Sequence, residues 1–188
     1  TGIKDGKYII TDLNGDGEIS DDDRTYVGDA QPDLTFGWQN NFTWKNWDFS
    51  FFFRGTIGNK VLNNPRAAYA NNTYLIGTNA LDDELTYTMK ESSRVCSYYL
   101  ENGSFIRLDN LALGYTFDTK KINWLDKARL YFAAQNLFVI TGYKGLDPEV
   151  ELFRGESSDT DAGLSPGIEP RQFFPKARTF TLGVNLTF

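Results

Sequence analysis

Hydrophobic and polar residues alternate with a period of two along five segments of the chain. In the last of these, Phe180, Leu182 and Val184 share one face, while Thr181 and Gly183 lie on the other. This period is typical of β-strands, because successive side chains of a strand point to opposite faces of a sheet. The alternation predicts strands at about residues 33–45, 47–57, 104–118, 128–140 and 177–188.

The predicted strands are long, and their connections alternate between short and long. They run to about 11–15 residues, whereas strands of soluble proteins peak near roughly 5–6 residues and a strand crossing a bilayer needs roughly 9–11. Short links at residues 45–46 and 119–126 alternate with long polar segments at 58–103 and 142–175. Outer-membrane β-barrels show this pattern, with short periplasmic turns and long extracellular loops.

The same alternation predicts how the chain is oriented. If the C-terminus lies at the periplasmic end, every short link falls on the periplasmic side and residues 1–32 form an extracellular loop. Trp44, Trp47 and Trp124 then fall at the periplasmic edge, where interfacial aromatic residues form a girdle. Five strands cannot close without leaving two edges exposed. We therefore expect an all-β fold in which residues 33–188 are the last, C-terminal strands of a much larger antiparallel transmembrane β-barrel.

The long segments carry little predicted regular structure. Residues 78–93 are the best candidate for a short helix, with Thr78 or Asn79 as its N-cap. Tyrosines of the 58–103 segment are candidates for substrate contact, although loop tyrosines serve packing just as often: Tyr69, Tyr74, Tyr98 and Tyr99.

Composition excludes several classes of function. The chain has no histidine, which excludes Ser-His-Asp and Cys-His catalysis and His-containing zinc sites. Its one cysteine, Cys96, excludes an internal disulfide. The net charge of −6 argues against a nucleic-acid partner, because phosphate binding needs a concentrated basic surface. Aromatic residues make up 15% of the chain, an excess that lipid-facing strands and a tryptophan edge would explain.

Residues 12–23 match the twelve-residue calcium loop of EF-hands at nearly every position. Gly17 stands at the sixth position, where the loop turns sharply, and Glu18 would offer its backbone carbonyl at the seventh. The twelfth position holds Asp23 in place of the usual Glu, so we expect a lower affinity. The residues before the loop look extended rather than helical, which predicts an isolated structural Ca²⁺ site. Its predicted ligands are Asp12, Asn14, Asp16, Glu18, Ser20 and Asp23.

Several segments together resemble the SusC/RagA-like TonB-dependent transporters. The sequence DLNGDGEI, which begins at Asp12, is followed in the family's order by GSFIRLDNLALGY from Gly103 and AQNLFVITGY from Ala134. Further matching segments lie at residues 26–37, 145–149 and 174–188. The resemblance covers nearly the whole chain except the loops at 58–102 and 150–172.

This resemblance implies a function beyond what the residues themselves indicate. Members of the family form 22-stranded outer-membrane barrels with a plugged lumen. They import oligosaccharides or peptides across the outer membrane of Gram-negative bacteria, using TonB and usually a SusD-like lipoprotein lid. The implied partners are therefore outer-membrane lipid, a SusD-like lipoprotein, TonB and a glycan or peptide substrate. The sequence lacks a plug, a TonB box and a signal peptide, so we expect these upstream and expect no transport by this segment alone.

Two other interpretations of the same residues are possible besides a transporter. A soluble calcium-dependent carbohydrate-binding β-sandwich would also contain many aromatic residues and an aspartate loop. The strand lengths and the alternation of turns and loops favour the barrel. An enzyme is the weakest alternative, because nothing positions the candidate carboxylate pairs Asp82/Glu84 and Glu149/Glu151 for catalysis. We therefore expect no enzymatic activity.

Overall fold

The computed structural model describes residues 1–71, 77, 79–120, 122, 124–150, 166–171 and 174–188. The chain divides into two compact units built from interleaved segments. The loop unit comprises Thr1–Pro32, Gly58–Gly103 and Gly142–Phe174, and the sheet unit comprises Asp33–Ile57, Ser104–Thr141 and Pro175–Phe188. The chain passes from one unit to the other after Pro32, where the sequence places the boundary, and the two long connections between strands group with the N-terminal segment.

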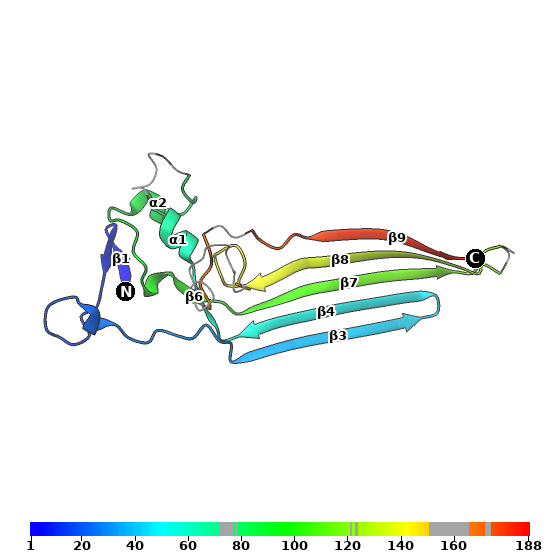
Figure 1. Cartoon of the computed structure of the whole chain (residues 1–188), viewed down its shortest axis with the longest axis horizontal. Helices are drawn as coiled ribbons and strands as arrows, with labels where there is room; N and C mark the ends of the chain where they lie inside the picture. The colour runs from blue at the N-terminus through cyan, green and yellow to red at the C-terminus, as the bar shows by residue number, and fades with distance from the viewer. Residues whose placement is uncertain (72–76, 78, 121, 123, 151–165, 172–173) are drawn as a thin grey trace, which may run out of the picture. The chain divides into compact units, whose positions relative to one another are not determined.

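The sheet unit is one antiparallel five-stranded sheet (Figure 1). Its strands follow the order β3-β4-β7-β8-β9, so neighbours in sequence are also neighbours in space. Each strand begins and ends within two residues of its predicted range. The bounds are Leu34–Trp44 for β3, Trp47–Ile57 for β4, Phe105–Phe117 for β7, Lys127–Thr141 for β8 and Thr179–Thr187 for β9.

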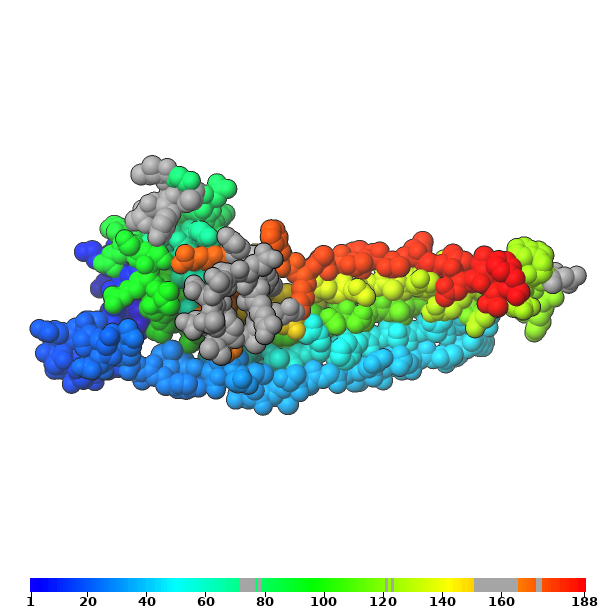
Figure 2. All heavy atoms as spheres, in the orientation of Figure 1, coloured from blue at the N-terminus to red at the C-terminus, as the bar shows by residue number. Residues whose placement is uncertain are grey.

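One face of this sheet is apolar on every strand. The register aligns Phe42 with Phe49, Phe49 with Leu113, Leu113 with Phe132, and Phe132 with Leu182, which makes one row across all five strands. Four of these five side chains are exposed, from 38% for Phe132 to 73% for Leu182, and Phe49 is half-buried. In Figure 2, atoms of all these strands lie side by side at the visible surface.

The opposite face carries mainly polar and small residues, with Phe52 and Tyr131 as aromatic exceptions. The neighbouring row runs from Asn41 through Ser50, Ala112 and Ala133 to Thr181. Because side chains of a strand alternate between faces, the two rows lie on opposite sides of the sheet. Along these two rows the sheet is therefore apolar on one side and polar or small on the other, across all five strands.

Aromatic residues gather at the end of the sheet where the short links lie. The link between β3 and β4 is Lys45 and Asn46, with Lys45 in the left-handed region at φ 55°. Trp47 contacts Tyr115 with ring centroids 4.7 Å apart, and Trp124 stacks on Phe188 at 5.8 Å. The three tryptophans that the sequence assigns to one edge thus lie at the same end of the sheet.

The loop unit contains more regular structure than the sequence predicts. Gly2–Lys4 (β1) and Lys7–Ile9 (β2) form a hairpin, and Lys60–Leu62 (β5) pairs with Leu100–Asn102 (β6). The helices are Asn64–Tyr69 (α1) and Glu84–Thr88 (α2), with short 3-10 turns at Asp21–Asp23 and Ser97–Tyr99. No helix in the described part of the chain is long and apolar enough to cross a membrane.

Capping and burial explain the two helices. Asn63 caps α1 by accepting a hydrogen bond from the backbone N–H of Arg66, and Pro65 stands in the first turn. Helix α2 lies within the expected range 78–93, but its N-cap is Asp83 rather than Asn79, while Thr78 lies outside the described residues. The helices enclose a small core of Ala67, Ala70, Leu85, Met89 and Tyr99.

Candidate functional site

The calcium-type loop has the backbone turns that its glycines predict. Gly15 and Gly17 adopt left-handed conformations, at φ 76° and 85°. The loop ends in the 3-10 turn at Asp21–Asp23, which Ser20 caps by accepting a hydrogen bond from the backbone N–H of Asp22 at 3.1 Å. The β1–β2 hairpin precedes the loop, in agreement with the extended flank expected from the sequence.

Alternate side chains of the loop turn back onto its own backbone. The carboxylate of Asp12 accepts hydrogen bonds from the N–H groups of Gly15 (2.6 Å) and Gly17 (2.8 Å). Asn14 Oδ1 accepts from the N–H of Asp16, and Asp16 Oδ1 accepts from the N–H of Glu18 at 2.8 Å. Since a carboxylate has about four lone-pair sites, these bonds leave oxygen lone pairs for a cation.

Asp23 closes the loop on itself. Its two carboxylate oxygens accept hydrogen bonds from the N–H of Leu13 (2.7 Å) and the N–H of Ser20 (2.8 Å). The donations from Ser20 and Leu13 hold the pKa of the Asp23 carboxyl below its usual value, so the charged form is favoured. The last position of the motif is thus tied to its second position.

The donor set fits a hard divalent cation, which prefers carboxylate and amide oxygens. The structure holds Asp12, Asn14, Asp16 and Asp23 in one closed loop by the bonds just described, while the Ser20 hydroxyl serves as a helix cap. Among the residues that the structure describes, no group of three or more His, Cys, Asp or Glu side chains is arranged to hold a metal ion. Calcium binding by the loop stays a prediction.

The loop unit contains a buried polar cluster that the sequence does not predict. Glu169 is fully buried, at 0% exposure, and accepts hydrogen bonds from the Tyr143 hydroxyl (2.6 Å) and the Leu146 N–H (2.9 Å). Burial raises the pKa of Glu169 even though these donors stabilise its charged form. The neighbouring backbone is tied to β5, because the N–H of Glu169 donates to the carbonyl of Leu62 at 3.1 Å.

A second cluster surrounds Arg66. Its guanidinium contacts Asp83 at 2.8 Å and Glu101 at 3.4 Å, and it lies over the ring of Tyr98 with Cζ 5.7 Å from the centroid. Glu101 also accepts a hydrogen bond from the backbone N–H of Lys144 at 2.8 Å. Nothing local in the sequence signals this cluster, because its members lie far apart along the chain.

Comparison with known proteins decides the family. The chain is 36% identical over 197 residues to TonB-dependent receptor P3 of Formosa agariphila, an alignment that covers 97% of this chain and 19% of that receptor. It is 30% identical over 194 residues to TonB-dependent receptor SusC of Bacteroides thetaiotaomicron, covering 96% of this chain and 17% of SusC. The chain belongs with the SusC/RagA-like TonB-dependent receptors. No protein-family model matches it.

Solved structures agree with this family assignment. The RagAB peptide importer in its closed-closed state superposes with a TM-score of 0.70 at 25% identity, over 94% of this chain and 20% of that chain. The open-open state gives a TM-score of 0.69. The predicted fold class is therefore confirmed: the open antiparallel sheet is a portion of the wall of a large SusC/RagA-like β-barrel. The chain spans only about one fifth of the length of these relatives.

The other candidate residues have structural contacts in this SusC/RagA-like chain. Tyr99 is buried and its hydroxyl lies 3.0 Å from that of Tyr8, so it packs in the core. Asp82 lies 3.4 Å from the Tyr87 hydroxyl, and the backbone N–H of Glu149 donates to Asp147. Tyr74 and Glu151 lie outside the described residues.

Proposed function

We propose that this chain is part of a TonB-dependent receptor that imports nutrients across the outer membrane of a Gram-negative bacterium. The observation that carries the proposal is the apolar row from Phe42 to Leu182, which crosses every strand of the sheet. In water such a face would expose large side chains at high free-energy cost, whereas in a bilayer it meets acyl chains. The relatives named as TonB-dependent receptors support the same conclusion.

Strand length supports a membrane location. The strands of the sheet have 9 to 15 residues, and a tilted strand needs roughly 9–11 to cross the hydrocarbon core. The soluble β-sandwich is not favoured, because a sandwich buries one face of each sheet against another. Within the described ranges, the other two sheets have only two strands each, and both belong to the loop unit.

The similarity to known receptors supports a proposal for the substrate class and the partners. We propose that the receptor takes up oligosaccharides, or else peptides, driven by TonB and assisted by a SusD-like lipoprotein. The likeness to SusC supports the lipoprotein partner, and RagAB is named as a peptide importer. We further propose that residues 1–32 and the other segments of the loop unit face the cell exterior, and that the receptor itself is not an enzyme.

We also propose that the loop at residues 12–23 binds Ca²⁺ and pins this exterior segment. Asp12, Asn14 and Asp16 would supply side-chain oxygens, Glu18 its backbone carbonyl, and Asp23 the carboxylate at the last position. Ser20 would contribute only through water, since its hydroxyl caps the following turn. When bound, the ion would crosslink segments of the loop through hard oxygen ligands and perform no chemistry.

Uptake by the full-length receptor tests the transport proposal. A strain that lacks the receptor gene would be complemented with the wild-type gene and supplied with labelled oligosaccharide or peptide pools. We expect to recover the protein in the outer-membrane fraction. We also expect the complemented strain to take up one of the two pools, and this uptake to stop when the gene is absent or when a protonophore collapses the proton-motive force. Recovery in the soluble fraction, or uptake indifferent to both treatments, would contradict the proposal.

A further inference from the structure

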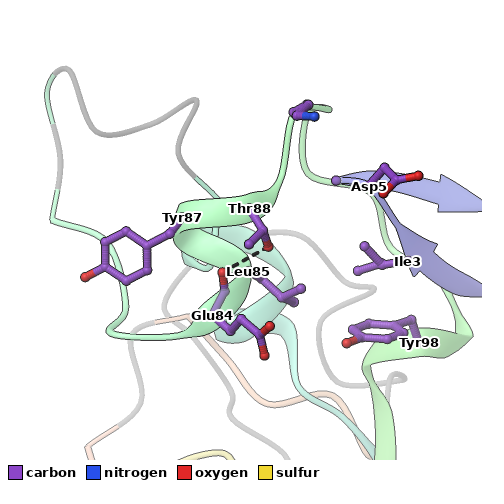
Figure 3. Close-up of a pocket in the computed structure, with 9 residues that line it drawn as sticks. Ile3, Asp5, Glu84, Leu85, Tyr87, Thr88 and Tyr98 are labelled. Carbon is purple, nitrogen blue, oxygen red and sulfur yellow. Dashed lines mark hydrogen bonds between the residues drawn. The ribbon is translucent and has the colours of Figure 1, made fainter.

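The loop unit contains a cavity of about 470 Å³ between the β1–β2 hairpin and helix α2, here called the hairpin cavity. Ile3 and Leu85 give it apolar surface, and Asp5, Glu84 and Lys90 are among its polar lining residues. Figure 3 shows Glu84 and Leu85 of α2 opposite Ile3 and Tyr98, whereas the ring of Tyr87 points away. The volume lies within the roughly 300–1,000 Å³ of small-molecule sites.

Close packing holds the cavity in a preformed shape. The hairpin turns at Asp5 and Gly6, both with left-handed backbones, at φ 52° and 79°. A Cβ on Gly6 would stand 2.2 Å from the carbonyl oxygen of Thr88, so hairpin and helix are in direct backbone contact. The N–H of Lys90 donates to the carbonyl of Gly6 at 2.9 Å. A ligand would therefore meet an organised site, which lowers the entropic cost of binding.

The acidic residues that line the cavity differ from the acidic residues nearby in the hydrogen bonds that their side chains make. Asp83, Glu91 and Glu101 each accept a hydrogen bond from a backbone N–H group or from Arg66, so their charges serve the fold. Among the described residues, no hydrogen bond or ion pair joins the side chain of Asp5 or Glu84 to another group. Both carboxylates keep their full capacity to accept hydrogen bonds from a ligand.

A second cavity, of about 340 Å³, shares Tyr98 with the first. Its lining includes Arg66, Glu101 and Lys144. Tyr98 thus stands between two hollows, each of which combines hydrogen-bond donors and acceptors. Such a pair suits an elongated ligand with several units better than a single small molecule.

We propose that the hairpin cavity binds one unit of a neutral oligosaccharide and that Tyr98 and the second cavity receive the adjoining unit. The hydroxyl groups of a sugar donate to Asp5 and Glu84 and accept from Lys90, while its C–H face packs on Ile3, Leu85 and Tyr98. Arg66 already lies over the ring of Tyr98, which disfavours a cationic peptide side chain on that ring. The inference rests on the proposed import function and assigns the substrate class that this part of the receptor recognises.

The test uses purified full-length receptor in detergent and isothermal calorimetry. The probes are neutral hexasaccharides of α-glucan, β-glucan, xylan and mannan, together with a lysine-containing hexapeptide. The variants are Asp5→Asn and Glu84→Gln, which keep the shape of each side chain, and Asn tolerates the left-handed backbone at position 5. Asp22→Asn, an exposed acid outside both cavities, is the matched control.

We expect at least one hexasaccharide to bind, with the affinity falling about tenfold in each cavity variant and unchanged in the control. Failure of every hexasaccharide to bind, or equal binding by wild type and cavity variants, overturns the proposal. Binding of the peptide that weakens in the same variants overturns the choice of ligand class. Sugar binding that depends on Asp5 and Glu84 in a receptor that imports nothing would support the cavity while contradicting the transport proposal.

Discussion

The guanidinium of Arg129 on β8 binds the carboxylate of Asp48 on β4 across the strand that lies between them. Its Nε donates to Asp48 Oδ1 at 2.9 Å and its Nη2 to Oδ2 at 2.5 Å. The pair passes over Gly114 of β7, where a Cβ would stand 2.5 Å from atoms of both partners. This two-point ion pair ties three strands together on the polar face of the sheet.

We expect Gly114→Ala to displace this pair and to destabilise the receptor by about 1 kcal/mol, the order of magnitude of a partly exposed but two-point ion pair. A double-mutant cycle with Asp48→Asn and Arg129→Gln should show coupling of the same size. Thermal unfolding of the full-length receptor in detergent measures both. Gly142→Ala is the control, because a Cβ there meets no atom within 4 Å. Equal losses in the two alanine variants would contradict this account.

Leu182 and Thr181 lie on opposite faces of β9, which makes them a matched pair for testing the membrane assignment. We expect Leu182→Arg to cost roughly 2–4 kcal/mol, because it places a charge among acyl chains near the middle of a strand. We expect Thr181→Arg to cost far less, because it faces the barrel interior. The free energy of unfolding in lipid vesicles, and the yield in the outer membrane, measure the difference. If both variants behave alike, the apolar face does not contact lipid.

Calcium should bind the loop at residues 12–23 and stabilise the segment around it. We expect titration of Ca²⁺ into the full-length receptor to release measurable heat, and saturation to slow proteolysis of the loop unit. The double variant Asp12→Asn/Asp16→Asn should lose both effects. The control Asp21→Asn/Asp22→Asn removes the same charge from residues that are not predicted ligands. Equal and negligible heats of binding in the wild type and in both variants would contradict the proposed Ca²⁺ site.

The buried carboxyl of Glu169 should make the loop unit sensitive to pH. Because burial raises its folded pKa above the usual 4.5, the folded state holds this proton more tightly than the unfolded state. The contribution of Glu169 to the stability of the folded loop unit is therefore greatest below pH 4.5 and falls as pH rises through the pKa of the folded state. The nearby negative charge of Glu101 raises the pKa of Glu169 further, whereas a hydrogen bond from the backbone of Asp147 lowers it. Limited proteolysis between pH 4 and 8, corrected for protease activity, should show this decline, and Glu169→Gln should flatten it. An unchanged pH profile in that variant would show that a group other than Glu169 causes the pH dependence.

Tyr143→Phe tests the same cluster by another route. It removes the hydroxyl that donates to Glu169 at 2.6 Å, leaving a buried acceptor with one partner fewer. We expect a loss of about 1–3 kcal/mol in the local stability of the loop unit, measured by hydrogen exchange of the Leu146 amide. Tyr26→Phe should have no effect, because that side chain is highly exposed. Comparable exchange in the two variants would show that the hydroxyl is dispensable.

The positions of the strands and of their two faces could be predicted from the order of residues along the chain. Phe180, Leu182 and Val184 alternate with Thr181 and Gly183, and β9 follows this alternation residue by residue. The reason is physical. The wall of a barrel faces lipid on one side and the barrel interior on the other, so every second side chain along a strand faces the same environment and has a similar polarity. The turns of the loop at residues 12–23 could also be predicted from its glycines and aspartates, because the conformation of a tight turn depends on only a few neighbouring residues.

The contacts between residues far apart in the sequence could not be predicted and depend on the folded structure. Glu169 and Tyr143 are 26 positions apart, and Asp48 and Arg129 are 81 apart. Their pairing depends on strand register and on the path by which each long connection returns, neither of which leaves a periodic trace in the sequence. The hairpin cavity arises in the same way, because its walls come from residues 3–6, 84–90 and 98. Alternation is local and could be read along the chain, whereas these sites exist only where the folded chain brings separate segments into contact.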